Sequence, residues 1–274
     1  MFEVLVFGWA GKALVTTLLV AVLMRLMQRC GQRACGLITG LPTVTGPALL
    51  WLAASEGNNF AALAGAGSVA AGALCALFGW GYARASRHSG PAAALAVATV
   101  LAVLPAVLLV ISPLALGVLL AASIAVSLAC IAGLRTGAPR QMARQPTCAP
   151  SNVAVTAIVA GVVSGSVSLL AGDLGAFWSG VIAGAPLIAA IVGVRVHLDC
   201  GRPAVQAFMG AYCVGLLWRT ALAAVFCWLV PSTGAGWAML LACGAVLAAW
   251  AMLSAWRSWW AAMRLADHQL IPSS

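Results

Sequence analysis

Charge is what this sequence has least of. Only 7% of its 274 residues are Asp, Glu, Lys or Arg, whereas 64% are hydrophobic. A soluble globular chain carries roughly 25% charged residues, so the composition excludes that class. No polar segment is long enough to fold as a separate soluble domain. Instead, apolar runs of about 20 residues alternate with short basic loops, which is typical of a polytopic helical membrane protein.

Acidic and histidine side chains are missing from the apolar runs. The five acids, Glu3, Glu56, Asp173, Asp199 and Asp267, and the three histidines all fall at the ends of runs. An intramembrane hydrolase needs such groups inside the membrane. The chain also has no P-loop, no dinucleotide motif and no Cys-x-x-Cys pair. We therefore expect no enzymatic activity, no catalytic residue, no metal site and no cofactor.

Nine apolar runs predict nine transmembrane helices, and the N-terminus lacks the positive region of a signal peptide, so the first run should be retained. A polar tail, 256–274, is expected to lie along the membrane surface as an amphipathic helix. The expected helices cover about 3–24, 35–54, 60–83, 92–110, 114–133, 152–171, 176–194, 204–230 and 236–255.

The net charge of +9 is concentrated at helix ends. With the N-terminus outside, the inner loops hold twelve arginines and the outer loops hold no Lys or Arg. This asymmetry predicts a cytoplasmic C-terminus in a bacterial-type inner membrane. Because the cations flank the membrane, we expect the lipid bilayer as a partner and no nucleic acid.

One motif interrupts the second apolar run. The segment 36–47 holds two glycines four apart, Pro42 and Pro47, and three threonines. Proline removes a backbone donor, and a broken helix inside a membrane needs protein or a watery cavity around it. The Gly-x-x-x-Gly-x-Pro pattern recurs 144 positions later, where it ends in Gly184 and Pro186. Two interrupted helices at matching places in two halves indicate the binding site of a transporter.

The repeat gives the chain a domain plan. We expect an all-α integral membrane protein in which 1–110 is a first four-helix unit, 111–151 a linker helix and cytoplasmic loop, and 152–274 a second four-helix unit with a cytoplasmic tail. The single linking helix inverts the second unit relative to the first, with helices 2 and 7 broken. Gly57 and Gly201, and Val15 and Val159, match at the same offset.

This duplicated, inverted pair of four-helix units resembles the drug/metabolite transporter superfamily, whose small multidrug-resistance members pair antiparallel. The resemblance rests on topology and implies a transporter, with a homodimer as one possible assembly. Small multidrug transporters carry a glutamate near the centre of the first helix, where this chain has Lys12. That difference argues against export of cationic drugs.

Two cations are predicted inside the membrane. Lys12 lies about 14 Å into the first helix, and Arg219 lies midway along the eighth. A charge at that depth costs at least ~2.5 to 3.5 kcal/mol, and it normally faces the protein interior. No acid lies at matching depth, so the two cations indicate an anionic ligand. The alternative is that both bond to backbone carbonyls freed by the broken helices.

Further site residues come from the interruptions. A half-helix that starts near Pro47 directs free N–H groups into the membrane, which favours an anion. Serine and threonine side chains can instead bond their own helix backbone. The residues expected at the site are Lys12, Pro42, Thr43, Thr45, Gly46, Pro47, Ser164, Gly184, Pro186 and Arg219.

The predicted function is secondary transport of a small anionic solute or an anionic headgroup by alternating access. Two alternatives stay open at this stage. One is a translocase for a phosphorylated lipid, and the other is a membrane accessory subunit that transports nothing.

Overall fold

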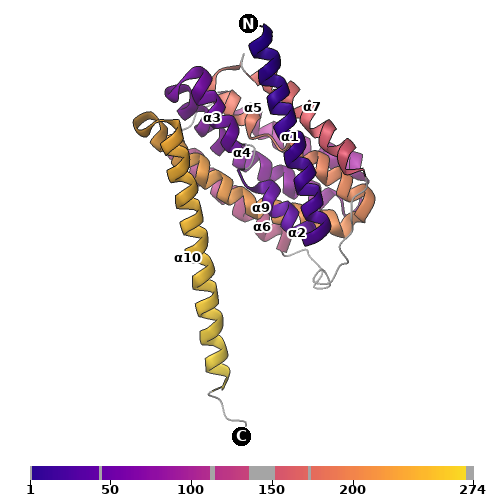
Figure 1. Cartoon of the computed structure of the whole chain (residues 1–274). Helices are drawn as coiled ribbons and strands as arrows, with labels where there is room; N and C mark the ends of the chain where they lie inside the picture. Colours follow the sequence, from indigo (N-terminus) through magenta and orange to yellow (C-terminus); the bar gives the residue numbers. More distant parts are fainter. Residues whose placement is uncertain (1, 43–44, 112–114, 136–151, 172–173, 270–274) are drawn as a thin grey trace.

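The part of the chain that the structure describes is built from helices and short turns. The computed structural model describes residues 2–42, 45–111, 115–135, 152–171 and 174–269 (Figure 1). The all-helical fold class is confirmed for these residues, which contain no strand. The helices are α1 (Phe2–Cys30), α2 (Gln32–Gly40), α3 (Thr45–Glu56), α4 (Asn58–Ala85), α5 (Pro91–Ile111), α6 (Leu116–Arg135), α7 (Val153–Ala171), α8 (Ala176–Ala183), α9 (Leu187–Thr233) and α10 (Ala235–Gln269).

Six stretches among the described residues are long and apolar enough to cross a membrane. Two further apolar helices, Ala13–Val22 and Val153–Val162, are shorter. These lengths indicate a multi-pass membrane protein. The six stretches are Gln32–Glu56, Asn58–Ala85, Pro91–Leu109, Leu116–Leu134, Ala176–Thr233 and Ala235–Trp256.

Helix α4 lies at the centre of the bundle. Most of its residues are buried, whereas α5 exposes most of its Val and Leu side chains. Glycines in α4 permit close contact with its neighbours. A Cβ atom on Gly65 would lie 2.9 Å from the Cβ of Cys227 in α9, and one on Gly67 would lie 3.0 Å from the amide nitrogen of Val181 in α8. These are the close helix contacts that small residues permit.

Both Gly-x-x-x-Gly-x-Pro motifs interrupt a helix, as predicted. Helix α2 ends at Gly40, Leu41 adopts an extended conformation, and α3 begins at Thr45. Helix α8 ends at Ala183, and α9 begins at Leu187 after Pro186. Proline lacks the N–H group that would continue each helix, so a turn of backbone carbonyls is released at each interruption.

The stretch 187–233 is one helix by hydrogen bonding but contains a kink. Gly201 has φ 78° and ψ −179°, which divides α9 into arms 187–200 and 202–233. Gly57 precedes α4 with φ 91° and ψ 169°, and lies 144 positions earlier. The pair Gly31 and Gly175 shows the same relation, with φ 84° and 81°. Only glycine adopts these angles without strain, and the 144-residue offset relates these two pairs of positive-φ glycines.

The C-terminal segment differs from the prediction. Helix α10 continues from Ala235 to Gln269 without a break, so no separate surface helix begins near residue 256. Figure 1 shows its C-terminal part projecting away from the other helices. The reason lies in the sequence, because no glycine or proline occurs between Gly244 and Pro272. The polar residues after 255 mark the end of the expected helix, but polarity alone does not terminate a helix.

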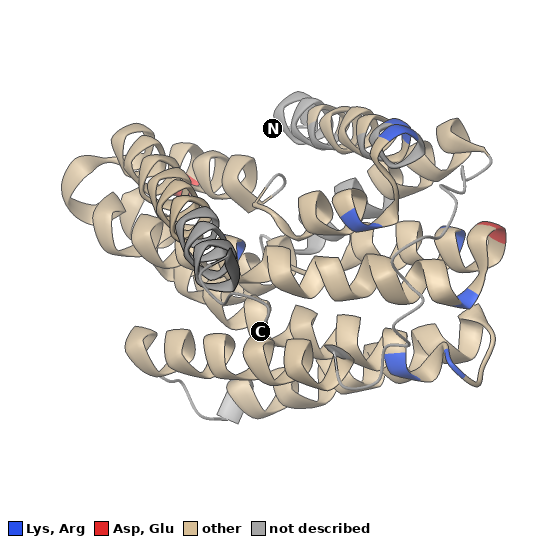
Figure 2. Ribbon diagram, turned by 90° about the horizontal axis from the view of Figure 1, so that it is seen from below, with Lys and Arg blue, Asp and Glu red and all other residues tan. Residues whose placement is uncertain are grey.

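Basic residues are distributed unevenly over the molecule. Figure 2 shows most of the described Lys and Arg segments toward one end of the bundle, at the right of the view. Two of these arginines are in contact, since a guanidinium nitrogen of Arg202 donates to the backbone carbonyl of Arg87 at 3.2 Å. The gathering of arginines on one side agrees with the asymmetry counted in the sequence.

Candidate functional site

The second helix interruption brings two long helices together at one carbonyl group. The carbonyl oxygen of Gly184 accepts a hydrogen bond from the Cys75 thiol of α4 at 3.1 Å. It also accepts one from Nη1 of Arg219 in α9 at 2.9 Å. One turn earlier, the Ser68 hydroxyl donates to the carbonyl oxygen of Gly180 at 3.1 Å. Side chains of α4 and α9 therefore satisfy the carbonyls at the end of α8.

Arg219 is the only Lys or Arg side chain classed as buried among those that the structure describes. Its exposed fraction is 5%, and the Cys75 thiol and Tyr212 lie close to its guanidinium group. Among the residues that the structure describes, Nη1 alone has a hydrogen-bond partner, and the buried Nε and Nη2 have none. A buried guanidinium with two unsatisfied nitrogens costs free energy, so the arrangement favours a ligand that accepts hydrogen bonds from both nitrogens.

No described acid neutralises Arg219. Asp199 is paired with Arg195 at 3.0 Å, and Glu56 is exposed at the end of α3. Arg219 therefore agrees in part with both hypotheses from the sequence, an anionic ligand and a bond to a freed backbone carbonyl. One nitrogen bonds a carbonyl released by a broken helix, as the structural alternative predicts. The other two nitrogens, Nε and Nη2, have no hydrogen-bond partner among the described residues.

The first interruption borders the same part of α9. A Cβ atom on Gly40 would lie 2.8 Å from the Cα of Gly215 and would overlap the carbonyl oxygen of Tyr212. Gly215 precedes Arg219 by one helical turn, so the two lie on the same side of α9. Both interruptions thus reach the same part of α9, near Arg219, one through Gly40 and the other through Gly184.

The remaining residues of the first motif lie around this contact. Thr45 and Gly46 are buried, and Gly46 faces Met239 of α10. Pro42 is half-buried, as is Pro186 of the second motif, whereas Pro47 is exposed. The Thr39 hydroxyl donates to the carbonyl oxygen of Cys35 in its own helix at 2.8 Å, which is the ordinary role of a helical threonine.

Three of the predicted site residues cannot be placed. Thr43 and the side chains of Lys12 and Ser164 lie outside the described residues. The backbone of Lys12 belongs to α1, which packs mainly against α7 and α2. A shared anion site for Lys12 and Arg219 therefore stays a prediction.

Contacts between the two halves occur in reciprocal pairs at the 144-residue offset. A Cβ atom on Gly36 would lie 2.9 Å from the carbonyl carbon of Phe208, and one on Gly180 would lie 2.8 Å from the Cα of Ala64. Gly36 corresponds to Gly180, and Ala64 corresponds to Phe208. The contacts of Gly40 with Gly215 and of Gly184 with Ala71 are related in the same way. Gly184 lies 144 positions after Gly40, and Gly215 lies 144 positions after Ala71.

Helices α1 and α7 meet at corresponding positions. A Cβ atom on Gly161 would overlap the Thr17 hydroxyl and would lie 2.5 Å from the carbonyl oxygen of Ala13. Thr17 and Gly161 are separated by the same 144 positions. A contact between corresponding residues is what a two-fold relation produces on its axis.

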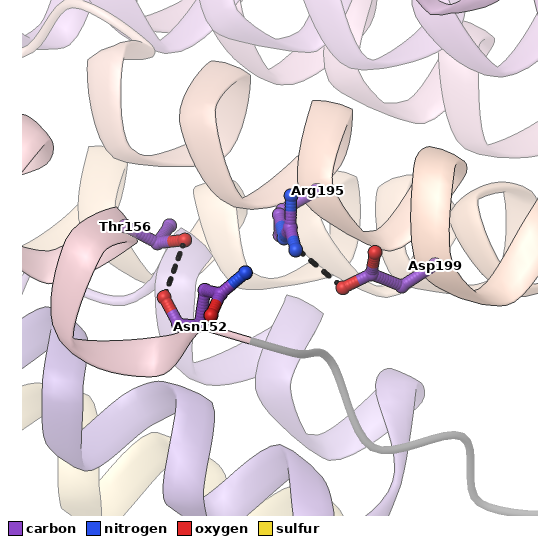
Figure 3. Close-up of polar contacts among 4 residues, drawn as sticks. All are labelled: Asn152, Thr156, Arg195 and Asp199. Atoms are coloured by element: carbon purple, nitrogen blue, oxygen red, sulfur yellow. Dashed lines mark hydrogen bonds and ion pairs between the residues drawn. The ribbon is translucent and has the colours of Figure 1, made fainter.

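The segment around His197 corrects a prediction. The sequence places His197 and Asp199 beyond the end of the expected helix 176–194, but both lie in the helical arm 187–200. His197 is 7% exposed, and its Nδ1 lies 3.3 Å from the Tyr82 hydroxyl. Figure 3 shows the Arg195–Asp199 ion pair near the start of α7, where the Thr156 hydroxyl donates to the carbonyl oxygen of Asn152 at 3.2 Å. Packing against α4 buries the histidine, and a local sequence pattern does not contain that contact.

Cys75 and Tyr212 are the site residues that the sequence reading missed. The position of Cys75 in an apolar run is typical of a small side chain that packs between helices, and no pattern in the sequence singled out Tyr212. A signal was present, because Cys75 is the position that the 144-residue offset assigns to Arg219.

A search of family models, of curated proteins and of solved structures found no match to this chain.

Proposed function

We propose that this chain is a secondary membrane transporter that carries a small anion by alternating access. One observation carries the proposal: Arg219 is buried between the two interrupted helices, and its Nε and Nη2 lack partners among the described residues. A midmembrane cation of this kind is a functional site by default, and inverted-repeat transporters bind their substrates where two interrupted helices meet.

The proposed architecture is nine crossings in two inverted four-helix units, with α6 as the linking helix. The reciprocal contacts of Gly36 with Phe208 and of Gly180 with Ala64 support it, since exchange of partners is the signature of a two-fold relation. The kink at Gly201 supports counting α9 as two crossings. One crossing between two four-helix units turns the second unit over, so the axis would lie in the membrane plane.

This architecture explains how the site could open to either side. Each interruption frees a short helix, α2 or α8, from a rigid continuation across the membrane. Glycines hold α2 against α9 and α8 against α4 at backbone distance, so each short helix can move with its partner. Alternation between an arrangement open to the outside and one open to the cytoplasm would expose Arg219 to one side of the membrane and then to the other. The arginine-rich end would face the cytoplasm, with the N-terminus outside.

The proposal is tested by anion uptake into liposomes that contain the purified full chain. A membrane potential that is positive inside drives uptake of radiolabelled chloride, phosphate or lactate. We expect Arg219→Met to reduce uptake of the transported anion to the level of protein-free liposomes. The matched control is Arg84→Met, which removes an exposed arginine from the last turn of α4 and should retain most of the uptake. Equal uptake by wild type and a folded Arg219→Met variant would refute the proposal and favour an accessory subunit.

A further inference from the structure

The guanidinium group of Arg219 has one edge engaged and one edge unused. Nη1 donates to the Gly184 carbonyl oxygen at 2.9 Å. Nε and Nη2, which have no partner in the described part of the chain, form the opposite side of the planar group. Their N–H bonds run parallel, and this pair is the one that grips a carboxylate through two hydrogen bonds. The unused edge is therefore a preformed two-pronged donor.

We infer that the anion is a monocarboxylate, which binds side-on to Nε and Nη2 of Arg219. This inference rests on the proposed function and names the chemistry of its substrate. The protein fixes the orientation of the fork by holding Nη1 on a carbonyl that α8 cannot use itself. Cys75 donates to the same carbonyl and lies near the guanidinium group.

The charge of the ligand follows from the count of buried charges. Arg219 carries the one buried positive charge among the Lys and Arg side chains that the structure describes, and no described acid pairs with it. A monoanion would neutralise it. A dianion such as sulfate or hydrogen phosphate would bring an additional negative charge into a low-dielectric interior, where an unpaired charge is costly.

Geometry separates a carboxylate from a halide. Chloride is a single spherical acceptor that needs only a nearby positive charge. A carboxylate presents two oxygens in one plane, matched to two parallel N–H donors. Lysine keeps the charge of arginine but has no planar fork, so replacing Arg219 with lysine distinguishes the two ligands.

The test is thermal unfolding of the purified full chain in detergent, followed by tryptophan fluorescence. The probes are sodium formate, acetate, lactate, pyruvate and benzoate, against sodium chloride, sulfate and phosphate at equal ionic strength. We expect at least one monocarboxylate to raise the midpoint of thermal unfolding. The effect should saturate below roughly 10 mM, a limit chosen because it lies above the usual range of KM. Arg219→Lys should raise the apparent dissociation constant by about tenfold or more, the loss of one charge-assisted hydrogen bond. Arg84→Lys should leave it unchanged.

The inference would be overturned if chloride or phosphate stabilised the wild-type protein as strongly as the best carboxylate. It would also be overturned if no carboxylate shifted the midpoint, or if a folded Arg219→Lys variant kept its affinity. The wild-type comparison needs no variant, so a folding defect cannot hide the answer. Arg219-dependent uptake of phosphate or chloride would leave the proposed function intact and refute the inference. Carboxylate binding without uptake of any anion would support the carboxylate site and refute the proposed transport function.

Discussion

Cys75 and Arg219 donate to the same acceptor, the carbonyl oxygen of Gly184, from two different helices. The thiol sulfur lies 3.1 Å from that oxygen and the guanidinium Nη1 lies 2.9 Å from it. The two residues are 144 positions apart, the same offset that relates the two Gly-Pro motifs. A two-fold relation would bring corresponding residues together in this way. The two residues differ in polarity at this shared carbonyl, since one supplies a thiol and the other a cation.

The first prediction exchanges these two residues. Arg219→Cys alone should abolish anion uptake, because it removes the buried cation. The double variant Cys75→Arg, Arg219→Cys should recover part of it, because the arginine then stands at the corresponding position of the other half, near Gly40 in place of Gly184. The measurement is uptake into liposomes. An inactive but folded double variant would mean that the two positions are not equivalent.

The second prediction concerns close backbone contact. Gly180→Ala should lower the free energy of unfolding by at least ~1–3 kcal/mol, because the new Cβ would collide with the backbone of Ala64. Gly36→Ala should act similarly against Phe208. The control is Gly210→Ala in α9, where no atom lies within 4 Å of the new Cβ and the helix gains up to about 1 kcal/mol. Unfolding midpoints in detergent check this, and equal stability of all three variants would contradict it.

The third prediction concerns orientation. Reporter fusions after Arg33, Arg87 and Arg202 should read cytoplasmic, and fusions after Asn58 and Thr233 should read periplasmic. The reason is the placement of arginines at one end of the helices. An external reading at Arg87 together with an internal reading at Thr233 would rule out nine crossings with this orientation.

The fourth prediction concerns the buried histidine. Tyr82→Phe removes the hydroxyl that lies 3.3 Å from Nδ1 of His197 and keeps the ring contact, with centroids 5.9 Å apart. The free energy of unfolding should fall by about 1 kcal/mol, the usual contribution of one buried hydrogen bond. Ser254→Ala, which removes an exposed hydroxyl from α10, serves as the control and should have no effect. A Tyr82→Phe variant as stable as wild type would show that the pair does not contribute.

The sequence predicted those features that depend on backbone chemistry. A proline that closely follows two glycines interrupts the helix at both motifs, so the interruptions near Pro42 and Pro186 could be located without a structure. The absence of acids in the apolar runs likewise identified Arg219 as a cation without a counter-ion. These inferences need only the residue and its neighbours along the chain.

Features that depend on tertiary contact were missed. A cysteine in an apolar run has the composition of a packing residue, and nothing local marks Cys75 as a donor to a carbonyl 109 positions away. His197 and Asp199 read as a loop because they are polar, yet packing against Tyr82 and the Arg195 ion pair keep them helical. The end of α10 was placed too early for the same reason.

The most direct test of the central claim is the accessibility of Cys75, whose exposed fraction is 0%. Two single-cysteine variants, one that retains Cys75 and one that retains Cys30, are treated with a membrane-impermeant anionic thiol reagent from either side of the liposome. Alternating access predicts that Cys75 reacts from both sides, that the transported anion protects it, and that Cys30, which is exposed, reacts regardless of the anion. If Cys75 in the folded protein stays unmodified from both sides while Cys30 reacts, Arg219 is a structural residue and the transporter account is wrong.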